Sequence, residues 1–456
     1  MRLLFAIALA ACAAGPLQAA PVLTVPPDLN GADPAPVRLS GLQPGQEVEL
    51  VTTRRANTSQ GFAPPSQRAF VAQARFRADA RGRVDLSAAA PVAGDYSGVD
   101  KAGLFWAAKD ARAPRESDPA AGRVRVEARV EGRAVGSAEA LTSPDKATLV
   151  TEPVADFPGA VFVHPPGAGR RPVIIVLGGS EGGSQTVKAF APRFAALGLA
   201  ALGLPYYDPG WSPGDRLPGL PNAFMNIPVD RLAAVHDWLA ARPDVDAGRI
   251  GVWGASKGAE FALIGASRYP WIKAVAAVVP TDVVWEGWGR PGPAAASFAF
   301  GGEGLPFQRY EGMEAELAKA AKGAPMSLRP VHDAGRRAHP GDLAAARIPV
   351  ERYKGPLVLI GGGDDQVWPS GEMARNVAVA RRKAGLPTTV IVEAHAGHGL
   401  GGPGYDPAGP LTALGGDAAS NARARRLGWK ATLEMFDRAL RPPQPQPQPQ
   451  PAAMLH

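Results

Sequence analysis

The pentapeptide Gly254-Ala255-Ser256-Lys257-Gly258 constrains the fold of this chain more than any other feature. It fits the pattern G-x-S-x-G, and it lies between a strand-like segment, Arg249 to Trp253, and a helix-like segment, Lys257 to Ser267. A turn of this kind is too tight for side chains two residues before and after the serine, which explains both glycines. The serine hydroxyl then stands above the sheet edge, at the positive end of the following helix. The pattern predicts a nucleophile elbow with Ser256 as the nucleophile.

An acid and a histidine follow this serine in the chain order that the elbow architecture requires. The apolar segment 357–360 ends in a loop that contains Asp364 and Asp365, and the strand-like segment 389–392 is followed by His395 and His398. A serine hydroxyl becomes a good nucleophile when an imidazole accepts its proton, and a carboxylate holds that imidazole in the correct tautomer. The sequence therefore predicts a Ser-His-Asp triad.

Two aspartates are candidates for the acid of this triad, and two histidines are candidates for its base. We favour Asp365, four residues before Pro369, over Asp364, whose side chain would turn toward the strand end as a structural cap. We favour His398 over His395, because the preceding Ala-Gly dipeptide lets the ring swing over the serine. The alternative for His395 is a loop histidine that faces solvent.

The oxyanion hole is expected from the backbone of two segments. One N–H group is that of Lys257, directly after the nucleophile, and the second is that of Ser180 or Glu181 in the glycine-rich loop 178–183. A phosphate-binding loop is the alternative for this glycine-rich segment, but neither G-x-G-x-x-G nor a Walker lysine is formed. For the side chains of Lys257 and Glu260 we expect a solvated pair or a salt bridge near the helix start.

The remaining histidines are His164, His236, His332, His339 and His456. None has a ligand-like spacing to another histidine, cysteine or carboxylate, so we predict neither a metal site nor another cofactor. The formal charge of +7, from 49 basic and 42 acidic residues, is spread along the chain and indicates no nucleic-acid surface.

Several segments, in the same order, resemble the acyl-CoA thioester hydrolase and bile acid-CoA:amino acid N-acyltransferase family. In the C-terminal part these are 254–263 with 274–279, 362–370, 396–398, and Leu414-Gly-Gly with Asn421-Ala and Trp429; in the N-terminal part they are 37–46, 78–86, and 96–100 with 103–106. The resemblance covers about residues 35 to 440. It implies an α/β-hydrolase fold behind an N-terminal immunoglobulin-like β-sandwich, Ser256, Asp365 and His398 as the triad, and small-molecule acyl thioesters as substrates.

One position departs from the part of the family that conjugates acyl groups to amino acids. Those members are expected to carry cysteine at the elbow, because a thioester intermediate passes its acyl group to an amine more readily than an ester does. Here the residue is Ser256, and the single cysteine is Cys12. We therefore predict an acyl-CoA thioesterase-type serine hydrolase. The alternatives are an exported carboxylesterase acting on oxygen esters, an N-acyltransferase, and a surface binding module with an inactive hydrolase domain.

Four parts of the chain are expected. Residues 1–20 have a short basic start, an apolar core and a small-residue cleavage site, as in a secretory signal peptide. Short alternating segments between Pro- and Gly-rich turns predict a β-sandwich over 21–145, and alternating strands and helices predict a parallel sheet covered on both faces over 146–441. The Pro/Gln repeat in 442–456 predicts a disordered tail.

The leader predicts a periplasmic or extracellular protein without a transmembrane segment, since the leader is too short to remain as a span. Residues Leu9 to Cys12 also resemble a lipoprotein cleavage box, which would lipidate Cys12. Export conflicts with a substrate made from coenzyme A, a cytoplasmic cofactor, so another ester or thioester is the alternative substrate.

A long segment, Thr281 to Tyr353, is expected to be irregular and to overhang the nucleophile. Its aromatic residues, among them Trp285, Trp288 and Phe298, are candidates for the wall of an acyl pocket. The alternative is that they fix the segment to the domain. Residues Tyr96 to Asp100 and Trp106 are expected either at a contact between the domains or near the site entrance. Oligomeric state cannot be inferred from the sequence.

Overall fold

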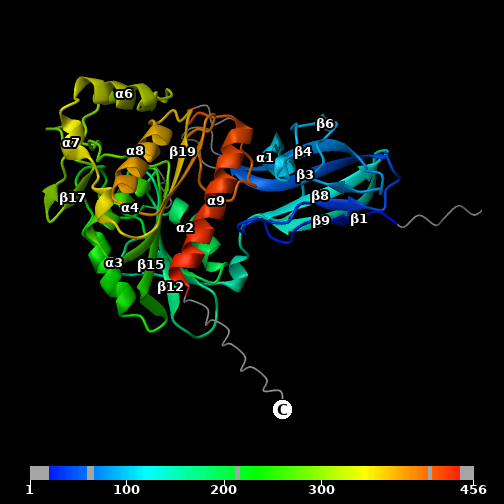
Figure 1. Ribbon diagram of the computed structural model, residues 1–456, viewed down its shortest axis with the longest axis horizontal. Helices are drawn as coiled ribbons and strands as arrows, with labels where there is room; N and C mark the ends of the chain where they lie inside the picture. The colour runs from blue at the N-terminus through cyan, green and yellow to red at the C-terminus, as the bar shows by residue number, and fades with distance from the viewer. Residues whose placement is uncertain (1–19, 59–65, 211–215, 409–412, 442–456) are drawn as a thin grey trace, which may run out of the picture.

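The computed structural model describes residues 20–58, 66–210, 216–408 and 413–441. The predicted signal segment through residue 19, Cys12 and the Pro/Gln tail lie outside these ranges. The described chain forms a larger α/β part and a smaller β part side by side (Figure 1). A 3₁₀ turn, Lys146–Thr148, connects the two parts.

The N-terminal part consists of two antiparallel sheets that face each other, as predicted for a sandwich. The large sheet has the order β6-β4-β3-β8-β9 with β7 paired to β4, and the small sheet has the order β1-β2-β5. Their bounds are β1 Val22–Thr24, β2 Arg38–Ser40, β3 Glu47–Thr58, β4 Ser66–Arg77, β5 Val84–Asp85, β6 Ala93–Gly94, β7 Lys109–Arg112, β8 Arg123–Val130 and β9 Arg133–Leu141. Alternate residues point inward, so Leu50, Phe76 and Val126 meet Leu39 and Val84 in one buried core.

The α/β part is built on a sheet with the order β10-β11-β13-β12-β15-β16-β19-β20. The pairs β10-β11 and β11-β13 are antiparallel and all the others are parallel. The bounds are β10 Val150–Pro153, β11 Val161–His164, β12 Arg171–Leu177, β13 Ala200–Gly203, β15 Val245–Ala255, β16 Ile272–Val278, β19 Leu357–Gly362 and β20 Thr388–Glu393. Central strand β12 is apolar almost throughout, as expected for a strand covered on both faces. This order confirms the α/β-hydrolase prediction.

Helices cover both faces of this sheet (Figure 1). Helices α3 (Arg231–Ala240), α4 (Lys257–Arg268) and α8 (Ser370–Lys383) pack on one face, and α2 (Gln185–Ala195) and α9 (Ala418–Leu440) pack on the other. Helix α9 was not predicted from the sequence. Its N-terminus is capped by the carboxylate of Asp417, which accepts a hydrogen bond from the N–H of Ser420.

The segment after β16 is more regular than predicted. It contains β17 (Phe298–Phe300) and β18 (Glu303–Gly304), which join β14 (Ile227–Pro228) in a small sheet, followed by the helices α5 (Met313–Ala320), α6 (Leu328–Ala338) and α7 (Asp342–Ala346) and a 3₁₀ turn, Val350–Arg352. Most residues of α5 are good helix formers, Glu, Ala, Leu and Lys, which the short flanking turns concealed.

Helix α9 and the loop before it contact the N-terminal part. The α1 turn, Gly103–Trp106, packs close to α9 (Figure 1). Asp100 accepts a hydrogen bond from Trp106 Nε1 (2.9 Å) and forms an ion pair with Arg426 of α9 (3.1 Å). Tyr96, Asp100 and Trp106 therefore belong to the contact between the domains, and none of them lines the cavity beside Ser256.

Candidate active site

Ser256 occupies a strained turn between β15 and α4. Its backbone angles are φ 55° and ψ −122°, a region that side-chain-bearing residues rarely adopt. A Cβ on Gly254 would lie 2.2 Å from the carbonyl oxygen of Gly258, and a Cβ on Gly258 would lie 2.3 Å from that of Gly178. Both glycines are therefore required by close backbone approaches. The N–H of Ser256 donates to the carbonyl of Val278 at the end of β16 (2.9 Å), which fixes the turn to the sheet.

Three side chains, each from the loop or turn after a different strand of the sheet, meet at this turn. His398 Nδ1 lies 2.8 Å from Asp365 Oδ2, and His398 Nε2 lies 2.9 Å from Ser256 Oγ. Because a carboxylate only accepts, Nδ1 carries the proton, and Nε2 accepts from the serine hydroxyl. The Asp365 side chain is fully buried and that of His398 is 10% exposed. The structure thus joins Ser256, His398 and Asp365 in one hydrogen-bonded chain.

Four donors surround the Asp365 carboxylate. Besides His398, the N–H groups of Val367 (2.8 Å) and Trp368 (3.3 Å) donate to Oδ1, and the hydroxyl of Ser370 donates to Oδ2. Ser370 Oγ in turn accepts from the N–H of Gly362 at the end of β19 (3.0 Å). These bonds hold the carboxylate in one orientation. Ser370 was not predicted as part of the site, although it directly follows Pro369 in the quoted motif.

The two rejected candidates point elsewhere. Asp364 is exposed, and its carboxylate accepts from Gln366 Nε2 (2.7 Å) and from the N–H of Gly416 (3.1 Å), so it connects two loops. His395 is exposed, and its carbonyl accepts from the N–H of Asp417. Neither side chain contacts Ser256 or His398.

Asn421 of α9 supports the histidine loop. Its side-chain oxygen accepts from the N–H of Gly397 (2.7 Å), and the N–H of His398 itself donates to the carbonyl of Leu414 (2.8 Å). Arg425, one turn further along α9, donates from Nε to the carbonyl of Gly399 (2.6 Å). Asn421 appeared in the sequence only as part of the resemblance, because nothing local marks an asparagine of a helix as a loop support.

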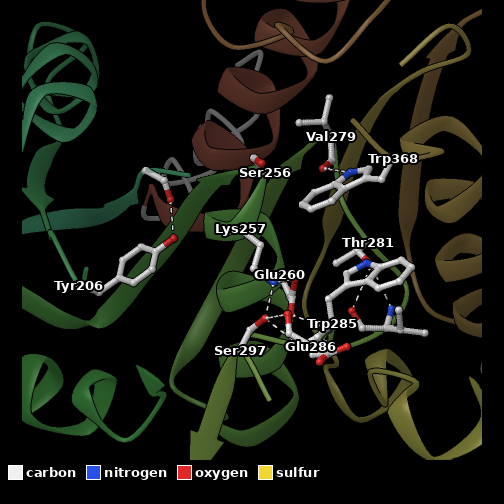
Figure 2. Close-up of polar contacts among 12 residues, drawn as sticks. Tyr206, Ser256, Lys257, Glu260, Val279, Thr281, Trp285, Glu286, Ser297 and Trp368 are labelled. Atoms are coloured by element: carbon white, nitrogen blue, oxygen red, sulfur yellow. Dashed lines mark hydrogen bonds and ion pairs between the residues drawn. The ribbon is translucent and has the colours of Figure 1, made fainter. Parts of the chain in front are cut away.

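The glycine-rich loop after β12 lies against the serine. A Cβ on Gly179 would come within 3.1 Å of Ser256 Cβ. The Tyr206 hydroxyl donates to the carbonyl of Gly178 (2.7 Å; Figure 2), and the Glu181 carboxylate accepts from the N–H of Gly179 (3.0 Å). Ser180 lines the cavity beside Ser256 and Glu181 does not, so of the two predicted donors the arrangement favours the N–H of Ser180. Lys257 is the first residue of α4, so its N–H has no partner within the helix.

A buried ion pair lies directly below the nucleophile (Figure 2). Lys257 Nζ is 2.5 Å from Glu260 Oε2 and 2.7 Å from Ser297 Oγ, and the side chains of the pair are 1% and 0% exposed. The expected solvated pair is therefore wrong, and the expected salt bridge is present but buried. Burial lowers the pKa of Lys257 and raises the pKa of Glu260, while each charge opposes the shift of the other.

Glu260 links this pair to the segment above the site. Its Oε1 accepts from the backbone N–H of Trp285 (3.1 Å), and Ser297 Oγ donates to the carbonyl of Trp285 (2.8 Å). Lys257 Nζ also lies 5.1 to 5.6 Å from the ring centroids of three aromatic residues, Phe224, Trp288 and Phe298. The start of α4 and the segment 285–298 are thus held together by polar groups in an apolar surrounding.

A cavity of about 650 Å³ opens beside Ser256. Its floor contains Ser180, Ser256 and Lys257. Its walls come from Tyr207, Pro209 and Asn222, from the segment 288–332 and from the acid loop, and most of their residues are apolar: Trp288, Met313, Leu317, Ala320, Ala321, Met326, Leu328, Val367 and Trp368. Of the three aromatics predicted for this wall, only Trp288 lines it. Trp285 and Phe298 are 0% exposed and pack into the domain core, so for these two the prediction is corrected.

Within the described ranges, no three histidine, cysteine, aspartate or glutamate side chains are grouped closely enough to hold a metal ion. Over the same ranges, no helix combines the length and the apolar character needed to cross a bilayer.

The sequence of this chain matches a known protein family. Residues 32–141 match the N-terminal region of acyl-CoA thioester hydrolases and BAAT, and residues 232–442 match the BAAT and acyl-CoA thioester hydrolase C-terminal region. The chain belongs to the acyl-CoA thioester hydrolase/BAAT family. The resemblance noted in the sequence is thereby confirmed, and so is the prediction of an enzyme of the hydrolase class.

Curated relatives of this family member cover nearly its whole length. Human mitochondrial acyl-coenzyme A thioesterase 2 is 25% identical, over 90% of this chain and 82% of its own. Mouse peroxisomal succinyl-coenzyme A thioesterase is 26% identical, over 90% and 94%. Rat acyl-coenzyme A amino acid N-acyltransferase 2 is 26% identical, over 91% and 97%.

Among solved structures, a thermostable carboxylesterase from a metagenomic library is similar, with 16% identity and a TM-score of 0.39, over 62% of this chain and 85% of that one. A puromycin-hydrolysing peptidase of Mycobacterium tuberculosis has 14% identity and a TM-score of 0.41, over 88% of this chain and 54% of that one.

Proposed function

We propose that this protein is a serine hydrolase that cleaves acyl thioesters to a free acid and a thiol through a triad of Ser256, His398 and Asp365. The observation that carries the proposal is the continuous chain of hydrogen bonds from Asp365 through His398 to the hydroxyl of a serine on a strained elbow. Family membership supports the thioester as the substrate class.

The geometry suits a two-step acyl transfer. Ser256 Oγ attacks the acyl carbonyl while His398 Nε2 takes the hydroxyl proton, and Asp365 stabilises the imidazolium that forms. The N–H groups of Lys257 and Ser180 face the oxyanion of the tetrahedral intermediate. Its collapse breaks the C–S bond, and the thiolate leaves with the proton from His398. A water molecule, deprotonated by His398, then hydrolyses the acyl-serine and restores the free hydroxyl.

Hydrolysis is favoured over amide synthesis by the identity of the nucleophile. A serine ester is less reactive toward amines than a cysteine thioester, and water needs no dedicated binding site. The test offers an acyl thioester together with millimolar glycine or taurine and identifies the product. We expect free acid as the main product, and an increased share of amide from Ser256→Cys. Predominant amide from the unaltered enzyme would assign it to the acyltransferases.

The leaving group is tested by a matched screen. Acyl-CoA thioesters of several chain lengths are compared with p-nitrophenyl esters of the same acids, using kcat/KM. Higher values for the thioesters are expected, and a consistent preference for the oxygen esters would make this protein a carboxylesterase. Labelling of Ser256 by a fluorophosphonate probe, absent in Ser256→Ala, excludes an inactive binding module.

We also propose that the protein is exported, on the basis of its leader sequence. Cell fractionation with a C-terminal tag tests this, and radioactive palmitate labelling tests lipidation of Cys12. Recovery of the full-length chain in the cytoplasm would contradict export and remove the conflict with a coenzyme A substrate.

A further inference from the structure

The glycine-rich loop after β12 carries one of the two proposed oxyanion donors, the N–H of Ser180. Other N–H groups of this loop are already bonded: that of Gly182 donates to the carbonyl of Gly179 (3.4 Å), and that of Gly183 donates to the carbonyl of Tyr207 (2.9 Å). In the part of the chain that the structure describes, the N–H of Ser180 donates to no protein group, and Ser180 lines the cavity. This N–H is therefore left open for a ligand.

The peptide unit between Gly178 and Gly179, just before this donor, is held at both ends. Its carbonyl oxygen, which belongs to Gly178, accepts from the Tyr206 hydroxyl (2.7 Å; Figure 2), and its N–H, which belongs to Gly179, donates to Glu181 Oε1 (3.0 Å). The C=O and N–H groups of a trans peptide point in opposite directions, so the two side chains hold the peptide plane from opposite sides. Rotation of this plane would break both hydrogen bonds.

The same peptide unit is where the loop meets the nucleophile. A Cβ on Gly179 would lie 3.1 Å from Ser256 Cβ and 2.6 Å from Glu181 Oε2, so only glycine fits between them. Glycine also tolerates many backbone conformations, and a free Gly179 would let the following N–H, that of Ser180, turn away from the cavity. The close approach to the nucleophile therefore requires that other groups fix the direction of this backbone.

Tyr206 is a rigid donor that keeps its proton. The residue is 3% exposed, and its ring packs edge to face against Phe261 (4.9 Å between centroids) and Phe224 (6.1 Å). Burial raises the pKa of Tyr206 well above its ordinary value, and the charges of Glu181 and Glu260 raise this pKa further. The hydroxyl is therefore protonated, and it donates to the carbonyl from a fixed position in the core.

We propose that Glu181 and Tyr206 are positioning residues that fix this peptide unit and thereby aim the N–H of Ser180 at the oxyanion. This inference rests on the proposed hydrolase function. Neither side chain lines the cavity, so both act through the backbone. A donor that already points at the developing charge needs no reorganisation during the reaction, and loss of one such donor lowers kcat by about a hundred- to a thousandfold. A donor that is present but poorly aimed loses part of this effect.

A role confined to the stability of the loop predicts a different result. Removal of a bond that only supports the fold lowers the melting temperature, but well below that temperature it leaves kcat and KM unchanged. A positioning role lowers kcat with little change in KM, and it weakens the binding of a transition-state analogue. An acyl trifluoromethyl ketone is a suitable analogue, because its adduct with Ser256 carries an anionic oxygen where the oxyanion forms.

The experiment compares Glu181→Ala, Glu181→Gln and Tyr206→Phe with the unaltered enzyme. Glu181→Ala and Tyr206→Phe each remove one bond to the peptide, so each should lower kcat about ten- to hundredfold, weaken the ketone by a similar factor and change KM less than about twofold. Glu181→Gln keeps an acceptor for the N–H of Gly179 and should retain kcat within about threefold. Because both bonds hold one peptide, Glu181→Ala combined with Tyr206→Phe should lose less than the product of the single losses.

Two matched controls remove the same kinds of bond elsewhere. Tyr353→Phe deletes a buried hydroxyl that donates to the carbonyl of Pro356 (3.2 Å), and Asp145→Ala deletes a carboxylate that accepts from the N–H of Ala147 (3.0 Å). Neither residue lines the cavity, so both variants should leave kcat and the affinity for the ketone unchanged.

Unchanged kcat and ketone affinity in either Glu181→Ala or Tyr206→Phe overturn the inference. So does a Glu181→Gln variant as impaired as Glu181→Ala, since the charge and not the bond would then be responsible. If neither thioesters nor esters are cleaved, the proposed function fails, and the rate at which a fluorophosphonate labels Ser256 replaces kcat, because phosphonylation places an anionic oxygen at the same N–H groups. Slower labelling of both variants then supports the inference, and equal rates overturn it. An unaltered protein that is not labelled at all overturns both proposals.

Discussion

The backbone at Ser256 is strained, and the neighbouring glycines and the hydrogen bond to Val278 hold it in this conformation. Replacing the hydroxyl alone leaves that turn intact, so Ser256→Ala should fold normally and bind substrate. We expect kcat to fall by at least about a thousandfold with little change in substrate affinity. Steady-state kinetics and equilibrium binding of an acyl thioester check this. Near-normal turnover in a variant with an unchanged melting temperature would refute the mechanism.

The neighbouring acids and histidines provide internal controls. Asp365→Asn disrupts the tautomer of His398, and His398→Ala removes the base, so each should reduce kcat by about a thousandfold or more. Asp364→Asn and His395→Ala alter exposed groups that contact only loops and should each reduce kcat less than about threefold. A larger effect of Asp364→Asn than of Asp365→Asn would exchange their roles.

At this scale the sequence pointed to the three side chains that the structure joins by hydrogen bonds, Ser256, His398 and Asp365, but not to all of their surroundings. The elbow is recognisable because glycine spacing and flanking periodicity are local properties. Trp285 and Phe298 were misplaced because aromatic residues near a site favour the core and a cavity wall equally, and only the fold decides which way each ring faces. Ser370 was missed although its partners Asp365 and Gly362 are near in sequence, because only the fold of the acid loop turns its hydroxyl toward the carboxylate.

Among elements, the start of α4 depends on the buried pair Lys257 and Glu260. Lys257→Met leaves an unpaired carboxylate without water and should destabilise the protein by about 3–5 kcal/mol. Lys257→Met combined with Glu260→Gln removes both charges and keeps an acceptor for the N–H of Trp285, so much of that loss should be recovered. Urea unfolding of the single and double variants gives the free energies.

The half-exposed pair of Arg347 and Glu351 is the matched control, because Arg347→Met should cost less than about 1 kcal/mol. Equal losses in Lys257→Met and in the double variant would mean that the unpaired charge is not the cause.

Helices and strands could be predicted where the repeat of their hydrophobic residues is visible within the segment itself. Strands β15, β19 and β20 were expected near their observed positions, since buried parallel strands are continuous apolar segments. Helix α5 escaped prediction because it is short and partly exposed, and its helical residues stand between glycine and proline turns. Helix α9 escaped prediction although Asp417 caps its N-terminus, because Arg425 is buried and Leu427 is exposed, which interrupts the amphipathic pattern of the helix.

On the scale of the whole molecule, the N-terminal sandwich contacts the segment that follows His398. Arg54 of β3 donates to the carbonyl of Tyr405 (3.2 Å) and to the Asp406 carboxylate (2.9 Å). Arg193 of α2 lies 3.6 Å from the same carboxylate. The loop that begins at His398 is therefore held by residues of both domains. The sandwich supports the site through this loop, although no sandwich residue lines the cavity.

This anchor should make stability depend on pH. Burial alone would raise the pKa of Asp406, but the charges of Arg54 and Arg193 hold it below its ordinary value. A depressed pKa contributes stability that is present above the unfolded-state pKa, about 4, and is lost as the pH falls below it. Asp406→Asn should thus lower the melting temperature by about 2–4 °C at pH 7, and the difference should shrink from pH 4 downward.

Asp237→Asn, at a position where the side chain is 84% exposed, should have no such effect. A difference between Asp406→Asn and the unaltered protein that stays constant from pH 7 to pH 3 would show that the two arginines do not stabilise the ionised carboxylate.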